Sequence, residues 1–233
     1  MFIDWTYIIL VLPAVIFSLW ASARVNSTFN KYSKQYTRRG LTGAQAARFV
    51  LDRNGLTNVR IEQIAGNLTD HYDPSANVIR LSESVYGNTS TAAIGVACHE
   101  TGHAIQHAVG YTPVKIRTAI VPITNIGSKL SIPLILIGLA LSSMGQLYVN
   151  IAYLGCALFG LCVVFQLVTL PTEFNASNRA LRCIEADNIL VGDELQGARK
   201  TLSAAAMTYV AALAVTLMQF LRLLLLVSGS RRD

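Results

Sequence analysis

Charged side chains are scarce in this sequence. Asp, Glu, Lys and Arg together make up 14% of its 233 residues, while apolar residues make up 52%. Soluble domains carry about 25% charged residues on average. The apolar residues are also gathered in long runs without charge. This composition argues against an ordinary soluble domain and favours an integral membrane protein.

Cysteine is sparse as well. The four copies, Cys98, Cys156, Cys162 and Cys183, show no paired spacing, and two of them lie inside an apolar run. A disulfide framework is therefore not expected, which agrees with a reducing compartment.

Acidic residues are fewer than basic ones, 13 against 19, which gives a net charge of +6. Aromatic and basic residues are not interleaved as they are on nucleic-acid-binding surfaces, so no nucleic-acid partner is expected. Five basic residues instead follow the first apolar run: Arg24, Lys31, Lys34, Arg38 and Arg39. The positive-inside rule places this end of the run in the cytoplasm, with the lipid bilayer as partner.

Long apolar runs are what the sequence has in excess. Residues 5–23 form a stretch of 19 residues without charge, which is long enough to cross a bilayer as a helix. Residues 130–170 also lack charge and can form two spans joined near residues 142–146. Residues 202–227 form a further span, which only Arg222 interrupts. The sequence thus predicts a mainly α integral membrane protein with about four transmembrane helices.

The first run has an alternative interpretation as a signal peptide. Ala21-Ser22-Ala23 resembles a cleavage site, but only Asp4 precedes the run and its basic residues follow it. A signal peptide carries its positive charge before the apolar segment. We therefore expect residues 1–23 to remain as an uncleaved anchor.

One short motif, His99-Glu100-Thr101-Gly102-His103, points to chemistry. The surrounding residues continue a helical run over about 89–109, with N-caps offered by residues 88–90 and Gly110 after its end. Residues i and i+4 share one face of a helix, so His99 and His103 can bind one Zn²⁺. Glu100 lies beside them as the general base that takes a proton from metal-bound water.

A catalytic zinc needs a third protein ligand and an open position. No histidine other than His107 follows His103, so a carboxylate is expected. Glu173 is the best placed, because it opens a predicted helix just after Pro171 at the membrane edge. Two crossings between His103 and Glu173 would return the chain to the side that it left. The other candidates are Glu185, Asp187, Asp193 and Glu194.

A transition state with a developing oxyanion benefits from a second electrophile beside the metal. His107, one turn beyond His103, is the predicted catalytic candidate, and His71 and Arg179 are further ones. For His107 the alternatives are capping of the helix end or a hydrogen bond to a ligand. A strand at 78–81 can bind substrate backbone by edge addition, or simply cover the core.

Local signals predict the remaining elements. Thr42 can cap a helix that runs through Leu51 and is closed by Asn54-Gly55. Strands are expected at residues 59–64, 69–72 and 77–82.

Two further helices are expected, from Glu173 to Leu190 and from Asp193 into the last span. Residues 114–129 fit either a membrane helix that starts near Thr118, with Lys129 facing protein or water, or a helix in the interface.

The expected organisation is an anchor at 1–23, a zincin-like α+β region at 24–117, a transmembrane hairpin at 118–170, a third-ligand helix and turn at 171–201, and a final transmembrane helix with its tail at 202–233.

Residues 70–74, 78–82, 98–107, 169–177 and 208–212 resemble the bacterial membrane zinc metallopeptidases of the YugP type, over nearly the whole chain. More distantly, the order of zinc helix, membrane hairpin and Glu-x-x-Ala helix is similar to HtpX-type and Ste24-type membrane proteases. That resemblance implies that Glu173 is the third ligand. Those proteases have an Asp four residues after this Glu, which orients a zinc histidine; here Ser177 stands there, with Asn175 and Asn178 as candidate replacements.

The favoured function is a zinc-dependent endopeptidase in the cell membrane, with its active site facing the cytoplasm and a peptide or membrane protein as substrate. A non-catalytic zinc-binding scaffold or chaperone-like adaptor is the alternative, although it would not need Glu100. A transporter needs polar groups in several spans, and only Lys129 and Arg222 qualify.

Overall fold

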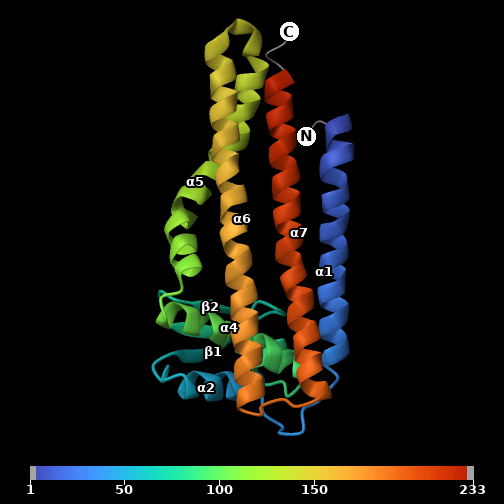
Figure 1. Ribbon diagram of the computed structural model, residues 1–233, viewed down its shortest axis with the longest axis vertical. Helices are drawn as coiled ribbons and strands as arrows, with labels where there is room; N and C mark the ends of the chain where they lie inside the picture. Colours follow the sequence, from blue (N-terminus) through green and yellow to red (C-terminus); the bar gives the residue numbers. More distant parts are fainter. Residues whose placement is uncertain (1–3, 230–233) are drawn as a thin grey trace. The chain divides into compact units, whose positions relative to one another are not determined.

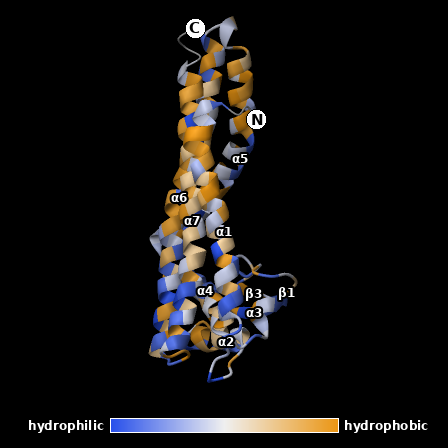
Figure 2. Ribbon diagram, turned by 90° about the vertical axis from the view of Figure 1, so that its right-hand side faces the viewer, coloured by the Kyte–Doolittle hydropathy of each residue, from blue (hydrophilic) through white to orange (hydrophobic). Residues whose placement is uncertain are grey.

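The computed structural model describes residues 4–229. They divide into two compact units. Of the described residues, the apolar unit comprises 4–20, 116–170 and 208–229, and the mixed unit comprises Ala21–Lys115 and Pro171–Met207. Figure 1 labels the elements along the chain, and Figure 2 shows that hydrophobic residues predominate along the helices of the apolar unit.

Four of the described helices are long and apolar enough to cross a membrane. The first begins as a π-helical turn at Tyr7–Val11 and continues as α1, Leu12–Tyr32. The others are α5 (Thr112–Ala140), α6 (Gln146–Ala186) and α7 (Asp193–Gly229), and a short 3₁₀ turn, Ser142–Met144, joins α5 to α6. The prediction of about four long apolar helices is confirmed.

Helix α5 covers the region for which the sequence left two arrangements open. It is one continuous helix although Pro122 and Pro133 lie inside it, each of which removes a single backbone donor. Lys129 is exposed on this helix, so it does not pack inside the chain.

Helix α6 corrects a predicted boundary. The sequence suggested a new helix at Glu173 after a break at Pro171, whereas α6 runs unbroken through Pro171 as far as Ala186. The part of α6 that follows Pro171 is held in place by packing, because Ala180 and Ile184 are fully buried in the core of the mixed unit. The predicted start of α7 at Asp193 is confirmed.

The sheet of the mixed unit has three strands, β1 (Arg60–Ile64), β2 (His71–Asp73) and β3 (Val78–Ser82), in the order β1-β3-β2. Strand β3 is parallel to β1 and antiparallel to β2, and four of its five residues are buried. The expected β2–β3 pair is confirmed. Edge addition of a substrate to residues 78–81 was a wrong expectation, because β3 already has a partner on each side.

The remaining helices of the mixed unit begin at well-defined caps. Helix α2 (Gly43–Arg53) starts at a capping box in which Thr42 and Gln45 bond each other reciprocally. A single turn, α3 (Glu83–Tyr86), follows β3. Helix α4 (Thr91–Ala108) carries the His-Glu motif and starts at Ser90, whose side chain accepts from the Ala93 amide at 3.3 Å.

Helix α4 lies between two apolar cores. On one face, Ile94, Cys98 and Ile105 pack with buried residues of α2, α6 and α7. On another face, Ala93 and Ala97 pack with the buried residues of the sheet. Packing on two faces fixes the rotation of α4 about its axis and leaves a third face for the two histidines.

Candidate metal centre

The structure brings together His99, His103 and Glu173. One ligand atom from each lies within 4.8 Å of the others. Oε2 of Glu173 is 3.3 Å from Nε2 of His99 and 3.4 Å from Nε2 of His103. The two imidazole rings are 4.8 Å apart and nearly perpendicular, at 83°. A carboxylate on α6 thus faces the same pair of nitrogens that α4 presents.

Gly102 explains how α4 and α6 approach closely enough for this. A Cβ atom at position 102 would overlap the carbonyl oxygen of Ala176 on α6. The sequence suggested that Gly102 leaves room for a metal. Its bare α-carbon instead makes room for the backbone of the helix that carries Glu173.

Each histidine has a hydrogen-bond partner at its other ring nitrogen. Nδ1 of His99 is 3.0 Å from Oγ of Ser177, and Nδ1 of His103 is 3.0 Å from Oε1 of Gln106. Both Nε2 atoms therefore remain turned towards Glu173. Ser177, which stands where the resembling proteases have an Asp, thus contacts one of the two histidines itself. Asn175 accepts a hydrogen bond from Gln106, the partner of the other histidine.

The centre is shielded from water. Glu173 is 3% exposed and Glu100 is 7% exposed. Burial by itself lowers the pKa of His103, but the contact with Glu173 and the charge of Glu100 outweigh it and raise this pKa above its usual value. The surplus of negative charge around the histidines favours a cation at this point.

Glu100 also acts on a carboxyl group of the neighbouring loop. Burial, and to a smaller extent the charge of Glu100, raise the pKa of Asp70. Asp70 accepts hydrogen bonds from the amide of Ser82 at 2.8 Å and from its hydroxyl at 3.0 Å. The predicted base and Asp70 are thus close enough for their charges to interact.

The structure places His107 outside the three-residue cluster. Its ring packs edge-on against Tyr72 of β2, with the ring centroids 5.5 Å apart. A catalytic role for His107 stays a prediction.

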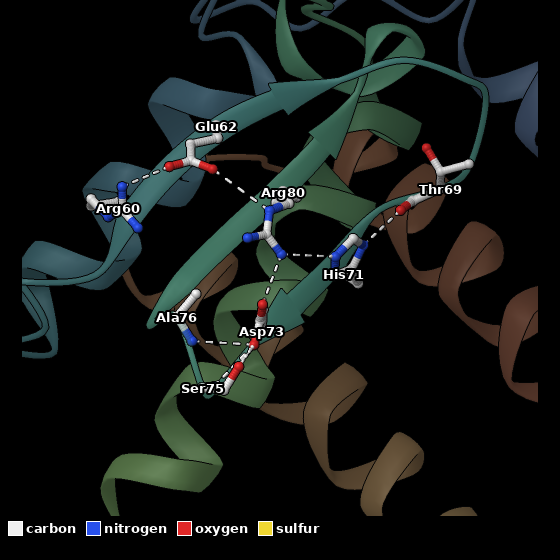
Figure 3. Close-up of polar contacts among 8 residues, drawn as sticks. All are labelled: Arg60, Glu62, Thr69, His71, Asp73, Ser75, Ala76 and Arg80. Atoms are coloured by element: carbon white, nitrogen blue, oxygen red, sulfur yellow. Dashed lines mark hydrogen bonds and ion pairs between the residues drawn. The ribbon is translucent and has the colours of Figure 1, made fainter.

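The other two oxyanion candidates also have partners of their own. His71 lies on the sheet, where Nε2 is 3.4 Å from Nη1 of Arg80 and Nδ1 is 3.0 Å from the carbonyl of Thr69 (Figure 3). Arg179 donates from Nε to Oδ1 of Asn175 at 2.7 Å, and its guanidinium lies 5.9 Å from the ring centre of Tyr111.

Figure 3 also shows what holds Arg80 in place. Its Nη1 atom is 2.8 Å from Oδ2 of Asp73, and its Nε atom is 3.6 Å from Oε2 of Glu62. Hydrogen bonds from Ser75 and Arg80 hold the pKa of Asp73 well below its usual range. This cluster joins the three strands on their polar face and explains His71 as part of the sheet.

The remaining carboxylates considered as third ligand lie elsewhere. Glu185 is exposed, and Asp187 pairs with an arginine of α2 at 3.2 Å. Asp193 contacts the guanidinium of Arg38 at 3.4 Å, and Glu194 accepts from the backbone amide of Arg38 at 2.8 Å.

Gln106 is the residue of the centre that sequence reasoning missed. It is fully buried and lies three positions after His103 on the same helix. A buried amide beside an expected metal ligand is a signal, because such a group requires hydrogen-bond partners. Its partners come from α6 and could not be read from the local sequence.

Comparison with known proteins identifies the family. Residues 7–228 match a family described as "Putative neutral zinc metallopeptidase", and the chain belongs to this family. The sequence is 45% identical over 227 residues to the "Putative membrane protease YugP" of Bacillus subtilis (strain 168). That alignment covers 97% of this chain and 99% of the relative. No solved structure matched the chain.

Proposed function

We propose that this protein is a membrane-embedded zinc endopeptidase, with His99, His103 and Glu173 as the metal ligands and Glu100 as the general base. The observation that carries the proposal is the approach of one Glu173 oxygen to both Nε2 atoms, at 3.3 and 3.4 Å. The family and the name of the relative support the general class of a zinc peptidase.

The donor set fits zinc. Two imidazole nitrogens and one carboxylate oxygen are the ligands of the metallopeptidases that bind zinc through an HExxH helix. Three protein ligands leave a fourth position open, as a catalytic site requires, whereas a structural zinc is closed by four. The partners at both Nδ1 atoms orient the rings from outside, as is usual for metal-bound histidines.

When bound, zinc supplies Lewis acidity, which lowers the pKa of water and polarises a carbonyl group. Glu100 accepts the proton of the attacking water and passes it to the leaving amine. Glu100 is 7% exposed, so its carboxylate is largely screened from bulk solvent. His107 remains a candidate for stabilising the oxyanion.

We further propose that the four long apolar helices cross the cell membrane and that the centre faces the cytoplasm. The apolar unit exposes large apolar side chains, such as Ile126 at 62% and Leu154 at 54%, which lipid would cover. The basic residues after the first helix support the orientation. A peptide or a membrane-protein segment near the bilayer is the proposed substrate.

The variant Glu100→Gln tests the mechanism. It keeps the size of the side chain and one acceptor oxygen but removes the base. We expect zinc content equal to that of the unaltered protein and peptide cleavage reduced by at least ~100-fold, since general-base catalysis contributes about 10²- to 10⁴-fold. Metal analysis and a fluorescent peptide assay on the purified full chain measure the two.

If the protein binds zinc but shows no cleavage that depends on Glu100, the result contradicts a zinc endopeptidase. It would then support the alternative, a non-catalytic zinc-binding scaffold. Chelation of the metal with subsequent zinc addition is the control, since cleavage must be lost and then restored.

A further inference from the structure

We propose that Gln106 is a positioning residue with two effects. It fixes the tautomer of His103, and it holds the His103 ring in place relative to the helix turn that carries Glu173. The inference rests on the proposed zinc centre. Gln106 is fully buried and makes three hydrogen bonds. Nε2 donates to the carbonyl of Thr172 at 2.7 Å and to Oδ1 of Asn175 at 3.0 Å, and Oε1 lies 3.0 Å from Nδ1 of His103.

The orientation of the Gln106 amide follows from its partners. A backbone carbonyl can only accept, so the NH₂ group of Gln106 must face Thr172. The second partner gives the same answer. Oδ1 of Asn175 also accepts from Nε of Arg179 at 2.7 Å, and arginine has only donors, so this atom is an oxygen. Both partners of the Gln106 nitrogen are therefore acceptors.

The tautomer of His103 follows from the orientation of Gln106. The atom of Gln106 that faces Nδ1 is the carbonyl oxygen, so Nδ1 must carry the hydrogen of this bond. In the neutral ring the lone pair is then on Nε2, the nitrogen that lies 3.4 Å from Oε2 of Glu173. Zinc binds an imidazole through such a lone pair.

The same side chain also connects the two ligand-bearing helices. Thr172 directly precedes Glu173 in the chain, so Gln106 binds the backbone next to one ligand and the ring of another. His99 lacks an equivalent restraint, because the Ser177 hydroxyl can donate as well as accept. Gln106 is therefore expected to matter more for metal affinity than Ser177.

The test compares zinc affinity in four full-length proteins, using competition with a chromophoric chelator at neutral pH. Gln106→Met keeps the volume but removes donor and acceptor, and we expect zinc to bind 10- to 100-fold more weakly, the usual effect of losing such a partner. In Gln106→Glu the side chain faces two acceptors, Thr172 and Asn175, which favours its protonated form. That form keeps the acceptor towards His103 and one donor towards Thr172, so it should bind zinc more tightly than Gln106→Met.

Thr201→Val is the matched control. Thr201 is buried in α7, where its hydroxyl donates to the Gly197 carbonyl at 3.0 Å, and the variant likewise loses one buried polar group. Zinc affinity should not change in this variant. Cobalt substitution gives a second measurement, because the visible spectrum of bound Co²⁺ should change in Gln106→Met and stay unchanged in Thr201→Val.

Two results would overturn the inference. One is that Gln106→Met binds zinc within threefold of the unaltered protein, with the same cobalt spectrum. The other is that Gln106→Glu loses as much affinity as Gln106→Met. If Gln106→Met does not fold, Gln106→Asn, which keeps the amide but is one methylene shorter, takes its place. Absence of zinc binding by the unaltered protein would instead refute the proposed centre itself.

Discussion

At the scale of single residues, the carboxylate of Glu173 is the acidic group that faces both histidines of α4. It is 3% exposed and reaches two imidazoles, whereas Glu185 on the same helix faces solvent. Glu173→Gln removes the anionic oxygen while keeping the shape. We expect zinc affinity to fall by more than the ~100-fold that loss of an outer partner costs. Zinc retained after dialysis measures this, and Glu185→Gln, which should retain zinc fully, is the control.

The raised pKa of His103 leads to a prediction of how zinc binding depends on pH. In the metal-free chain Glu173 and Glu100 raise the pKa of His103, so the protonated ring is stabilised until the pH rises through that pKa. The extra proton occupies Nε2, which zinc needs. Zinc affinity should therefore fall on acidification, by up to about tenfold per pH unit for each proton displaced. Zinc titrations between pH 6 and 8 check this, and affinity that does not vary with pH would contradict it.

At the scale of elements, the distance between α4 and α6 depends on Gly102. Gly102→Ala would place a methyl group against the Ala176 carbonyl and force the two helices apart. We expect a loss of stability of about 1–3 kcal/mol, the usual effect of overpacking, together with weaker zinc binding. Gly87→Ala is the matched control, because nothing lies within 4 Å of a Cβ atom there. Thermal unfolding and zinc titration of both variants decide the question.

The elements also show what local sequence can predict. The caps at Thr42 and Ser90 and the strand pair at β2–β3 follow from short-range rules, and they are where the sequence predicted them. The unbroken course of α6 through Pro171 does not follow, because proline is a local stop signal that distant packing overrides. The central place of β3 likewise depends on β1, to which no short turn connects it.

The candidate centre likewise has some contacts that the sequence predicts and others that it does not. The approach of His99 and His103 is a consequence of helical spacing, and Glu173 could be selected as a carboxylate at the membrane edge. The contacts of Gln106 with Thr172 and Asn175 span 66 and 69 positions, and no periodic pattern encodes them. Contacts of this kind become visible only when the packing of α4 on α6 is known.

At the scale of the whole molecule, an ion pair connects the N-terminal segment of the apolar unit with its last helix, α7. Nη2 of Arg222 in α7 lies 2.9 Å from Oδ2 of Asp4, and the guanidinium is 5.4 Å from the ring centre of Tyr7. Arg222 is 4% exposed. This explains a charged residue in the last apolar run, and it gives the first helix a structural role that cleavage would abolish.

We therefore expect the mature protein to keep its first helix, and Asp4→Asn to lower the midpoint of thermal unfolding because it leaves Arg222 buried without its counter-charge. The double variant Asp4→Asn with Arg222→Met should recover part of this loss. Intact mass of the purified chain and unfolding scans measure both effects. A mass that lacks the first 23 residues would contradict the expectation.

The bare α-carbon at position 102 has a consequence for how natural variation should be interpreted. Gly102 contributes no functional group, yet any larger residue would collide with a backbone atom that no rotamer change can move aside. Among homologous sequences this position should tolerate replacement as poorly as the histidines on either side of it. Invariance at a site of this sort reflects shape, and it should not be mistaken for participation in bond making.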